Sequence, residues 1–169
     1  IEQANSRLRS TGRYAAIYMS SHVYNNLTLE PVWTKSDWAD LCIYLKATGL
    51  TPVILGAEWD AAFARDVSVE IAAKGHIPTS VWVNLTGRTP LPLAMAYMKN
   101  AEITVGIAAG LPIIAGHMGW ETLILWPVHG ISPVRVCEVQ EHGWSKEFGY
   151  SWVPPDIRES GAYTNLTVG

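Results

Sequence analysis

Polar side chains follow two apolar runs of this chain, where a ligand could bind. Ser20, Ser21 and His22 come directly after the apolar run from Tyr14 to Met19, and Glu58 follows a second run. Hydroxyl and imidazole groups can hydrogen-bond phosphate oxygens, and a carboxylate after a strand can accept bonds from ribose hydroxyls. An ordinary solvated residue near a helix start is an equally good interpretation of Glu58.

A third candidate position lies in the turn Leu85-Thr86-Gly87-Arg88-Thr89. Arg88 and Thr89 could present a cation and a hydroxyl to a diphosphate. They could equally be a surface arginine and the cap of the helix that Pro90 begins. Both interpretations stay open from the sequence.

The fourth candidate is a turn rich in small residues. Gly106 and Gly110 enclose Ile107, Ala108 and Ala109, and a helix begins near Pro112. Glycine allows a ligand to approach the backbone closely, and the start of a helix favours a phosphate. The alternative is that these small residues only let a strand and a helix pack tightly.

Several other chemistries lack their motifs. Neither GxGxxG nor GxxxxGK[ST] occurs, which disfavours NAD and P-loop chemistry. The histidines have no metal-ligand spacing and no DxD motif is present, so we expect no metal and no resident cofactor. No Ser/His/Asp set can be assembled from the sequence, and no catalytic residue is assigned.

The elements that must position these turns alternate along the chain. Strands are expected at 14–19, 52–56, 80–83, 103–106 and 123–126. Helices are expected between the Thr34 cap and Gly49, from the Asp60 cap to 74, at 90–98 and at 112–119. This alternation predicts an α/β fold with a doubly wound, mostly parallel sheet, and the stretch from Asn84 to Pro127 is its clearest strand–turn–helix segment. In such a sheet the candidate turns meet at the carboxyl ends of the strands.

Length and composition indicate one domain. The chain has 169 residues, of which 49% are hydrophobic and 16% charged. We expect a linker or N-terminal extension at 1–13, the α/β domain at 14–127, and an aromatic-rich extension of that domain with little regular structure at 128–169. The net charge of −3 argues against a nucleic-acid partner. Two unpaired cysteines and no membrane-length apolar run favour the cytoplasm, and the opening residues suggest a fragment of a longer protein.

Three segments carry a resemblance to a known family. Trp33 to Trp38 is similar to a WPxxxW motif, Gly49 to Gly56 to a G-x-x-V-V-L-x-G strand, and Leu85 to Thr89 follows in the family's order. From Tyr14 to Pro127 the chain resembles the C-terminal half of bacterial ADP-heptose–lipopolysaccharide heptosyltransferases. The resemblance implies one Rossmann-like half of a GT-B glycosyltransferase that binds the nucleotide-sugar donor, with Ser20 and Ser21 near the donor phosphates.

The chain departs from that family after its fourth strand. Where the family has a motif close to G-N-D-[ST]-G-P-x-H, this chain has apolar groups between Gly106 and Ile113. A different donor, or loss of activity, is therefore implied. The family's catalytic base belongs to an N-terminal, acceptor-binding domain that this chain lacks, so the fragment alone should bind a donor and transfer nothing, with at most peripheral membrane contact. The alternatives are a non-catalytic binding module that lost the donor site, and another nucleotide-sugar enzyme such as an epimerase.

Overall fold

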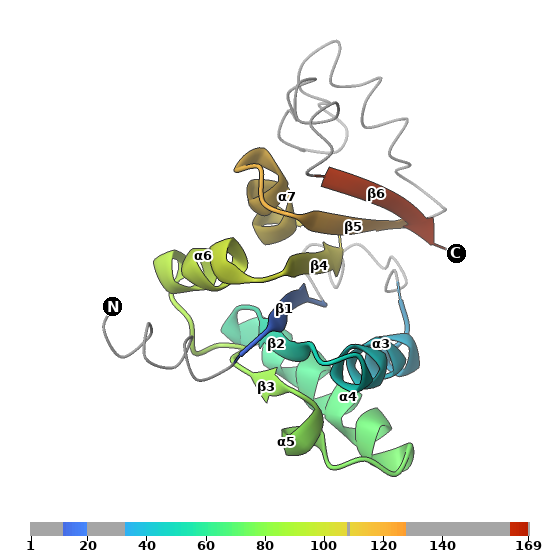
Figure 1. The fold of residues 1–169 in the computed structure, drawn as a ribbon. Helices are drawn as coiled ribbons and strands as arrows, with labels where there is room; N and C mark the ends of the chain where they lie inside the picture. The colour runs from blue at the N-terminus through green and yellow to red at the C-terminus, as the bar shows by residue number, and fades with distance from the viewer. Residues whose placement is uncertain (1–11, 20–32, 108, 128–162, 169) are drawn as a thin grey trace.

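The computed structural model describes residues 12–19, 33–107, 109–127 and 163–168. Its sheet has six strands in the order β3-β2-β1-β4-β5-β6, and each neighbouring pair is parallel (Figure 1). The strands are β1 Tyr14–Tyr18, β2 Thr51–Leu55, β3 Val83–Asn84, β4 Ile103–Ile107, β5 Thr122–Pro127 and β6 Tyr163–Val168. The predicted doubly wound, Rossmann-like α/β sheet is confirmed.

Helices cover both faces of this sheet (Figure 1). They are α3 Lys35–Ala47, η1 Glu58–Asp60, α4 Ala61–Ala73, α5 Pro78–Val81, α6 Leu91–Asn100 and α7 Gly110–His117. Buried side chains of α3, α4 and α5 form one core cluster with the sheet. Side chains of α6 and α7 form a second cluster on the opposite face. The chain therefore crosses from one face to the other between β3 and β4.

Strand β1 shows why its sequence is apolar throughout. Ala15 and Ile17 belong to the cluster under α3 and α4, while Tyr14 and Ala16 belong to the cluster under α6 and α7. Alternate side chains of a strand point to opposite faces, so a central strand covered on both sides is buried at successive positions, as Tyr14 to Ile17 are here. This explains the continuous apolar run that predicted the strand.

The start of α3 matches the prediction in detail. Thr34 and Asp37 form a capping box, with the Thr34 N–H donating to Asp37 Oδ2 at 2.8 Å and the Asp37 N–H to Thr34 Oγ1 at 3.2 Å. Trp38, Cys42 and Leu45 are buried on one face of the helix. The periodicity of the sequence therefore identified the buried face of α3 correctly.

The segment around the third strand differs from the prediction. Residues 78–81 form the short helix α5, because Pro78 takes its first position, where a missing N–H costs nothing. The strand is only the two residues Val83–Asn84, not 80–83. Both β3 residues pair with β2, so the element exists but is displaced toward the turn.

Two helix starts were misplaced, and a third helix is capped differently. Asp60 is the N-cap of α4, as predicted, but its side chain makes no capping hydrogen bond; the carboxylate instead accepts the Ala57 N–H at 2.9 Å. Pro90, not Thr89, is the N-cap of α6, because its backbone conformation is still extended. Helix α7 begins at Gly110 rather than Pro112. Proline was read as the first helical residue in each of the last two cases, and the first residue of a helix is poorly fixed by sequence.

Strand β6 is absent from the prediction. Tyr163–Val168 pairs in parallel with β5 over six residues, although 128–169 was expected to contain little regular structure. An edge strand separated from its partner by a long segment has no local signal beyond its own short alternation. The rest of the predicted extension, and the predicted linker up to residue 11, lie outside the described residues.

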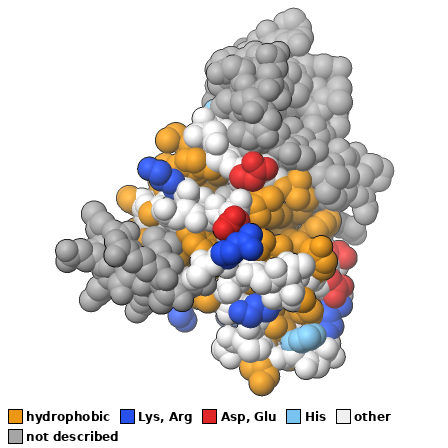
Figure 2. All heavy atoms as spheres, viewed as in Figure 1, with side chains coloured by type: hydrophobic (Ala, Val, Ile, Leu, Met, Phe, Trp, Pro, Cys, Tyr) orange, Lys and Arg blue, Asp and Glu red, His pale blue; other side chains and the backbone are white. Residues whose placement is uncertain are grey.

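The described surface has no single-sign electrostatic patch on the face in view. Lys and Arg side chains are scattered among Asp and Glu side chains, with hydrophobic surface between them (Figure 2). Among the helices in the described part of the chain, none has the length and apolar character needed to cross a lipid bilayer.

Cys42 offers a test of the α3 packing. Its side chain is fully buried, and burial raises the pKa of the thiol to about 12. A shift of this size lowers the thiolate population at pH 8 roughly a thousandfold. In a Cys137→Ser variant we expect Cys42 to resist a thiol reagent in the native state and to react at once in denaturant. Rapid labelling without unfolding would show that α3 does not shield this thiol.

Candidate ligand-binding site

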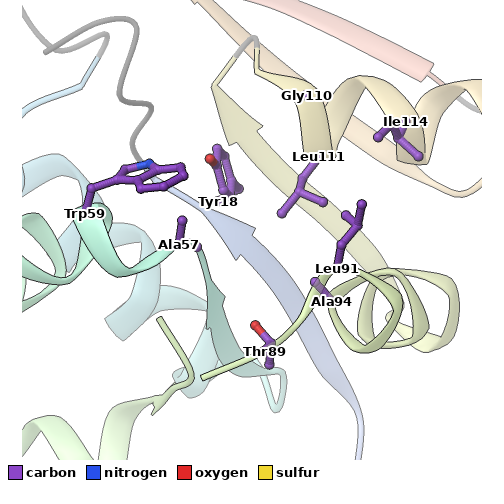
Figure 3. A pocket seen from close by; sticks show the side chains of 10 residues that line it. Tyr18, Ala57, Trp59, Thr89, Leu91, Ala94, Gly110, Leu111 and Ile114 are labelled. Carbon is purple, nitrogen blue, oxygen red and sulfur yellow. The ribbon is translucent and has the colours of Figure 1, made fainter. Parts of the chain in front are cut away.

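A pocket of about 310 Å³ opens at the carboxyl ends of the strands (Figure 3). Its lining comes from the end of β1, the loop and short helix η1 after β2, the residue Thr89 before α6, the first turn of α6, and the start of α7. The lining residues are Tyr18, Gly56, Ala57, Trp59, Thr89, Leu91, Ala94, Gly110, Leu111 and Ile114. Strand order reverses between β1 and β4, which is where ligands bind in doubly wound sheets.

The start of α7 forms one end of the pocket. No side chain caps this helix, and the first hydrogen bond of its opening turn runs from the Ile113 N–H to the Ala109 carbonyl. Because the earlier N–H groups of a helix have no intrahelical acceptor, those of Gly110 and Leu111 can bind an anion. A Cβ at Gly110 would meet nothing within 4 Å, so the backbone here borders open space.

Gly106 lies beside the pocket and allows close packing between β4 and α7. A Cβ at Gly106 would lie 2.6 Å from Pro112 Cγ and 2.8 Å from the Tyr18 carbonyl oxygen. Gly106 is buried and does not line the pocket, so its lack of a side chain lets α7 lie directly against β1 and β4. Of the two interpretations left open by the sequence, tight strand–helix packing is the one this geometry supports at Gly106.

Thr89 brings a hydroxyl to the pocket wall. Its Oγ1 is buried and has no hydrogen-bond partner among the described residues. Figure 3 shows the side chain among the groups that line the pocket. A buried hydroxyl without a partner costs free energy, and a ligand with an acceptor oxygen would remove that cost. Thr89 is therefore a candidate ligand contact, although it is not a helix cap.

On the side of the pocket away from Thr89, a tyrosine is hydrogen-bonded to a buried carboxylate. The Tyr18 phenol hydrogen-bonds Asp60, which is only 4% exposed, and the Asp60 carboxylate also accepts the Ala57 N–H. Burial, and then the Asp60 charge and hydrogen bond, raise the pKa of Tyr18 well above its ordinary value. The phenol, like an ordinary one, is protonated at neutral pH, and here it donates its hydrogen to Asp60.

The predicted site residues are divided by the structure. Thr89 and Gly110 line the pocket, while Gly106 and Ala109 are buried beside it. Glu58 and Arg88 are exposed and do not line the pocket. Gly87, just before Arg88, packs against Glu58. Its N–H donates to the Gly56 carbonyl at 2.9 Å. Four of the predicted residues lie outside the described part of the chain: Ser20, Ser21, His22 and Ala108.

Most of the apolar lining was missed. The sequence analysis selected loops by their polar and small residues, so it passed over Tyr18, Trp59, Leu91, Leu111 and Ile114. A usable signal was present for Tyr18, which is the last residue of a strand whose carboxyl end lies at the switch point. Trp59 carried a signal too, as a large aromatic residue in a loop that follows a strand.

Within the described residues there is no group of three or more His, Cys, Asp or Glu side chains that could hold a metal ion.

Removing the Tyr18 hydroxyl tests its pairing with Asp60. We expect Tyr18→Phe to lower the free energy of unfolding by about 1–3 kcal/mol, because a buried carboxylate loses a donor. Tyr14→Phe is the matched control; it breaks a neutral bond from the Tyr14 hydroxyl to the Tyr97 carbonyl at 2.8 Å and should cost about 0.5–1.5 kcal/mol. Urea unfolding of both variants gives the comparison. Equal losses, or a smaller loss for Tyr18→Phe, would contradict the charged pairing.

The fold and the pocket together define the architecture: a doubly wound parallel sheet with a pocket at the topological switch point. Solved glycosyltransferases share this fold. The ADP-heptose LPS heptosyltransferase II of E. coli matches with a TM-score of 0.62 at 18% identity, over 77% of this chain and 39% of that one. A glycosyl transferase family 9 structure from Veillonella parvula matches with a TM-score of 0.63 at 17% identity, over 98% of this chain and 40% of that one.

These likenesses concern the fold. The chain spans about two fifths of the length of each of the two structures. No protein-family model and no curated protein sequence matches it. The predicted structural resemblance to heptosyltransferases is thus confirmed for the α/β architecture, and what the pocket binds is a separate question.

Proposed function

We propose that this chain is the donor-binding half of a GT-B glycosyltransferase and holds a nucleotide sugar in the pocket at the carboxyl ends of β1, β2 and β4. The observation that carries the proposal is the coincidence of this pocket with the switch point and with the uncapped start of α7. The glycosyltransferase structures of the same fold support it. Transfer to a glycan or lipopolysaccharide acceptor, in a bacterial cytoplasm, belongs to the same proposal.

In this scheme the chain binds the leaving group of the transfer. An acceptor hydroxyl attacks the anomeric carbon of the donor sugar, the bond to the diphosphate oxygen breaks, and the acceptor proton passes to a base. The N–H groups of Gly110 and Leu111 and the hydroxyl of Thr89 would stabilise the charge on the departing diphosphate. The base is proposed to come from an acceptor-binding domain, so this chain alone binds a donor without transferring it. The scheme uses no resident metal or cofactor.

A second candidate function has its own observation. Among the described residues that line the pocket, none carries a formal charge, and Arg88 lies outside this lining. Diphosphate sites commonly include an Arg or Lys. A non-catalytic module that binds an uncharged ligand, or a protein partner, therefore remains the alternative to donor binding.

Thermal unfolding with nucleotides distinguishes the two functions. A ligand that binds only the folded state at a hundred times its Kd stabilises it by about 2.7 kcal/mol. We expect ADP, UDP, GDP or CDP at millimolar concentration to raise Tm, and the matching nucleoside alone to raise it less. If none of the four nucleotides changes Tm, the donor-binding function is wrong and the uncharged-ligand alternative stands.

A further inference from the structure

Trp59 is the largest side chain on the rim of the pocket, and it is unusually open to solvent. Its exposed fraction is 60%, although it lies among the lining residues. Leu91, on the opposite side of the pocket in Figure 3, is 55% exposed. Two large apolar groups thus border the opening, and exposed apolar surface at a groove is a feature of ligand-binding sites.

The turn that carries Trp59 is held firmly. Asp60 accepts the Ala57 N–H through its carboxylate at 2.9 Å and donates its own N–H to the Ala57 carbonyl at 3.1 Å. A Cβ at Gly56 would lie 3.0 Å from Asp60 Oδ2, so the loop is closely packed beneath the tryptophan. Because the backbone on both sides of Trp59 is held by these bonds, the indole is attached at a fixed point on the pocket rim, and the backbone needs little ordering when a ligand binds.

The two ends of the pocket favour different parts of one ligand. The uncapped start of α7 at Gly110 suits an anion, whereas Trp59 offers a flat aromatic face and no charge. A nucleoside diphosphate carries its anion at one end and an aromatic base at the other. A phosphate at Gly110 therefore leaves the base to reach the Trp59 side of the pocket.

We infer that Trp59 is the platform on which the base of the nucleotide stacks, an inference that rests on the proposed donor-binding function. Stacking accepts any base, because every base has a π face. Selection among the nucleotides then depends on groups at the base edge, and Trp59 supplies affinity without choosing the base.

Calorimetric titration of the whole chain with ADP, UDP and inorganic pyrophosphate tests this inference. Loss of one base–aromatic stack corresponds to about 5- to 150-fold weaker binding. We expect Trp59→Ala to weaken both nucleotides by a factor in this range and to leave pyrophosphate unchanged, while Trp59→Phe keeps most of the nucleotide affinity. Tyr44→Ala is the matched control, because Tyr44 is 65% exposed on α3 and does not line the pocket.

The possible results separate base stacking on Trp59 from the proposed donor-binding function. Wild-type nucleotide affinity in Trp59→Ala would overturn the stacking inference and leave donor binding intact. Equal weakening of pyrophosphate and nucleotide would also overturn it, because Trp59 would then act on the phosphate end. Absence of nucleotide binding by the wild-type chain would overturn both.

Discussion

Replacing Gly106 with alanine is expected to destabilise the domain by about 1–3 kcal/mol, the usual cost of forcing a methyl group into a packed interior. The new Cβ would lie 2.6 Å from Pro112 Cγ and 2.8 Å from the backbone oxygen of Tyr18. Neither neighbour is the free end of a flexible side chain. Relief of the conflict requires α7 to move away from β4 and the backbone at Tyr18 to shift as well, and the movement of α7 would also open the pocket beside Gly110.

Gly110→Ala is the matched control for this variant. A Cβ at Gly110 meets nothing within 4 Å, and the residue begins α7, where alanine is favoured over glycine by up to about 1 kcal/mol. We therefore expect Gly110→Ala to be neutral or slightly stabilising in urea unfolding. If both variants lose the same stability, close packing at Gly106 is not what its glycine provides.

Trp38→Ala is expected to have the largest effect on stability, a loss of about 3–5 kcal/mol. The side chain is fully buried under α3 and meets the Trp33 ring edge-on, with ring centroids 5.1 Å apart. Truncation would leave a cavity between α3 and the sheet. With losses of this size many small domains no longer fold at 37 °C, so the measurement is chemical unfolding at low temperature.

Two further tryptophan variants make this result specific. Trp38 Nε1 is buried without a hydrogen-bond partner among the described residues, so Trp38→Phe removes that polar group and should cost clearly less than Trp38→Ala. Trp59→Ala removes a side chain that is 60% exposed and should change stability by about 0.5 kcal/mol or less. A loss for Trp38→Ala no greater than that for Trp59→Ala would contradict the packing described for α3.

The sequence predicted the fold better than the site, for a physical reason. Strand β1 and helix α3 are specified locally, by a continuous apolar run and by a capping box before a helical stripe. Strands β3 and β6 depend instead on pairing with distant β2 and β5, which local patterns do not record. The helix starts were misplaced by one or two residues where proline lies near the cap.

The candidate site combines general rules with packing that only the fold reveals. The rule for parallel sheets selected the loops of Thr89 and Gly110, and both residues line the pocket. It could not show that Gly106 packs against Pro112, or that the Asp60 carboxylate turns back to Ala57 and Tyr18. These contacts depend on side chains from separate elements meeting in space.

Donor binding in this pocket is tested most directly by nuclear magnetic resonance. The backbone amides of ¹⁵N-labelled chain would be followed while ADP, UDP, GDP and CDP are added in turn. We expect at least one nucleotide to shift the amides of Gly56, Ala57, Gly110 and Leu111, which surround the pocket, and to leave those of α3 unchanged. No shift at millimolar nucleotide, or shifts confined to α3 and α4, would contradict the proposed function.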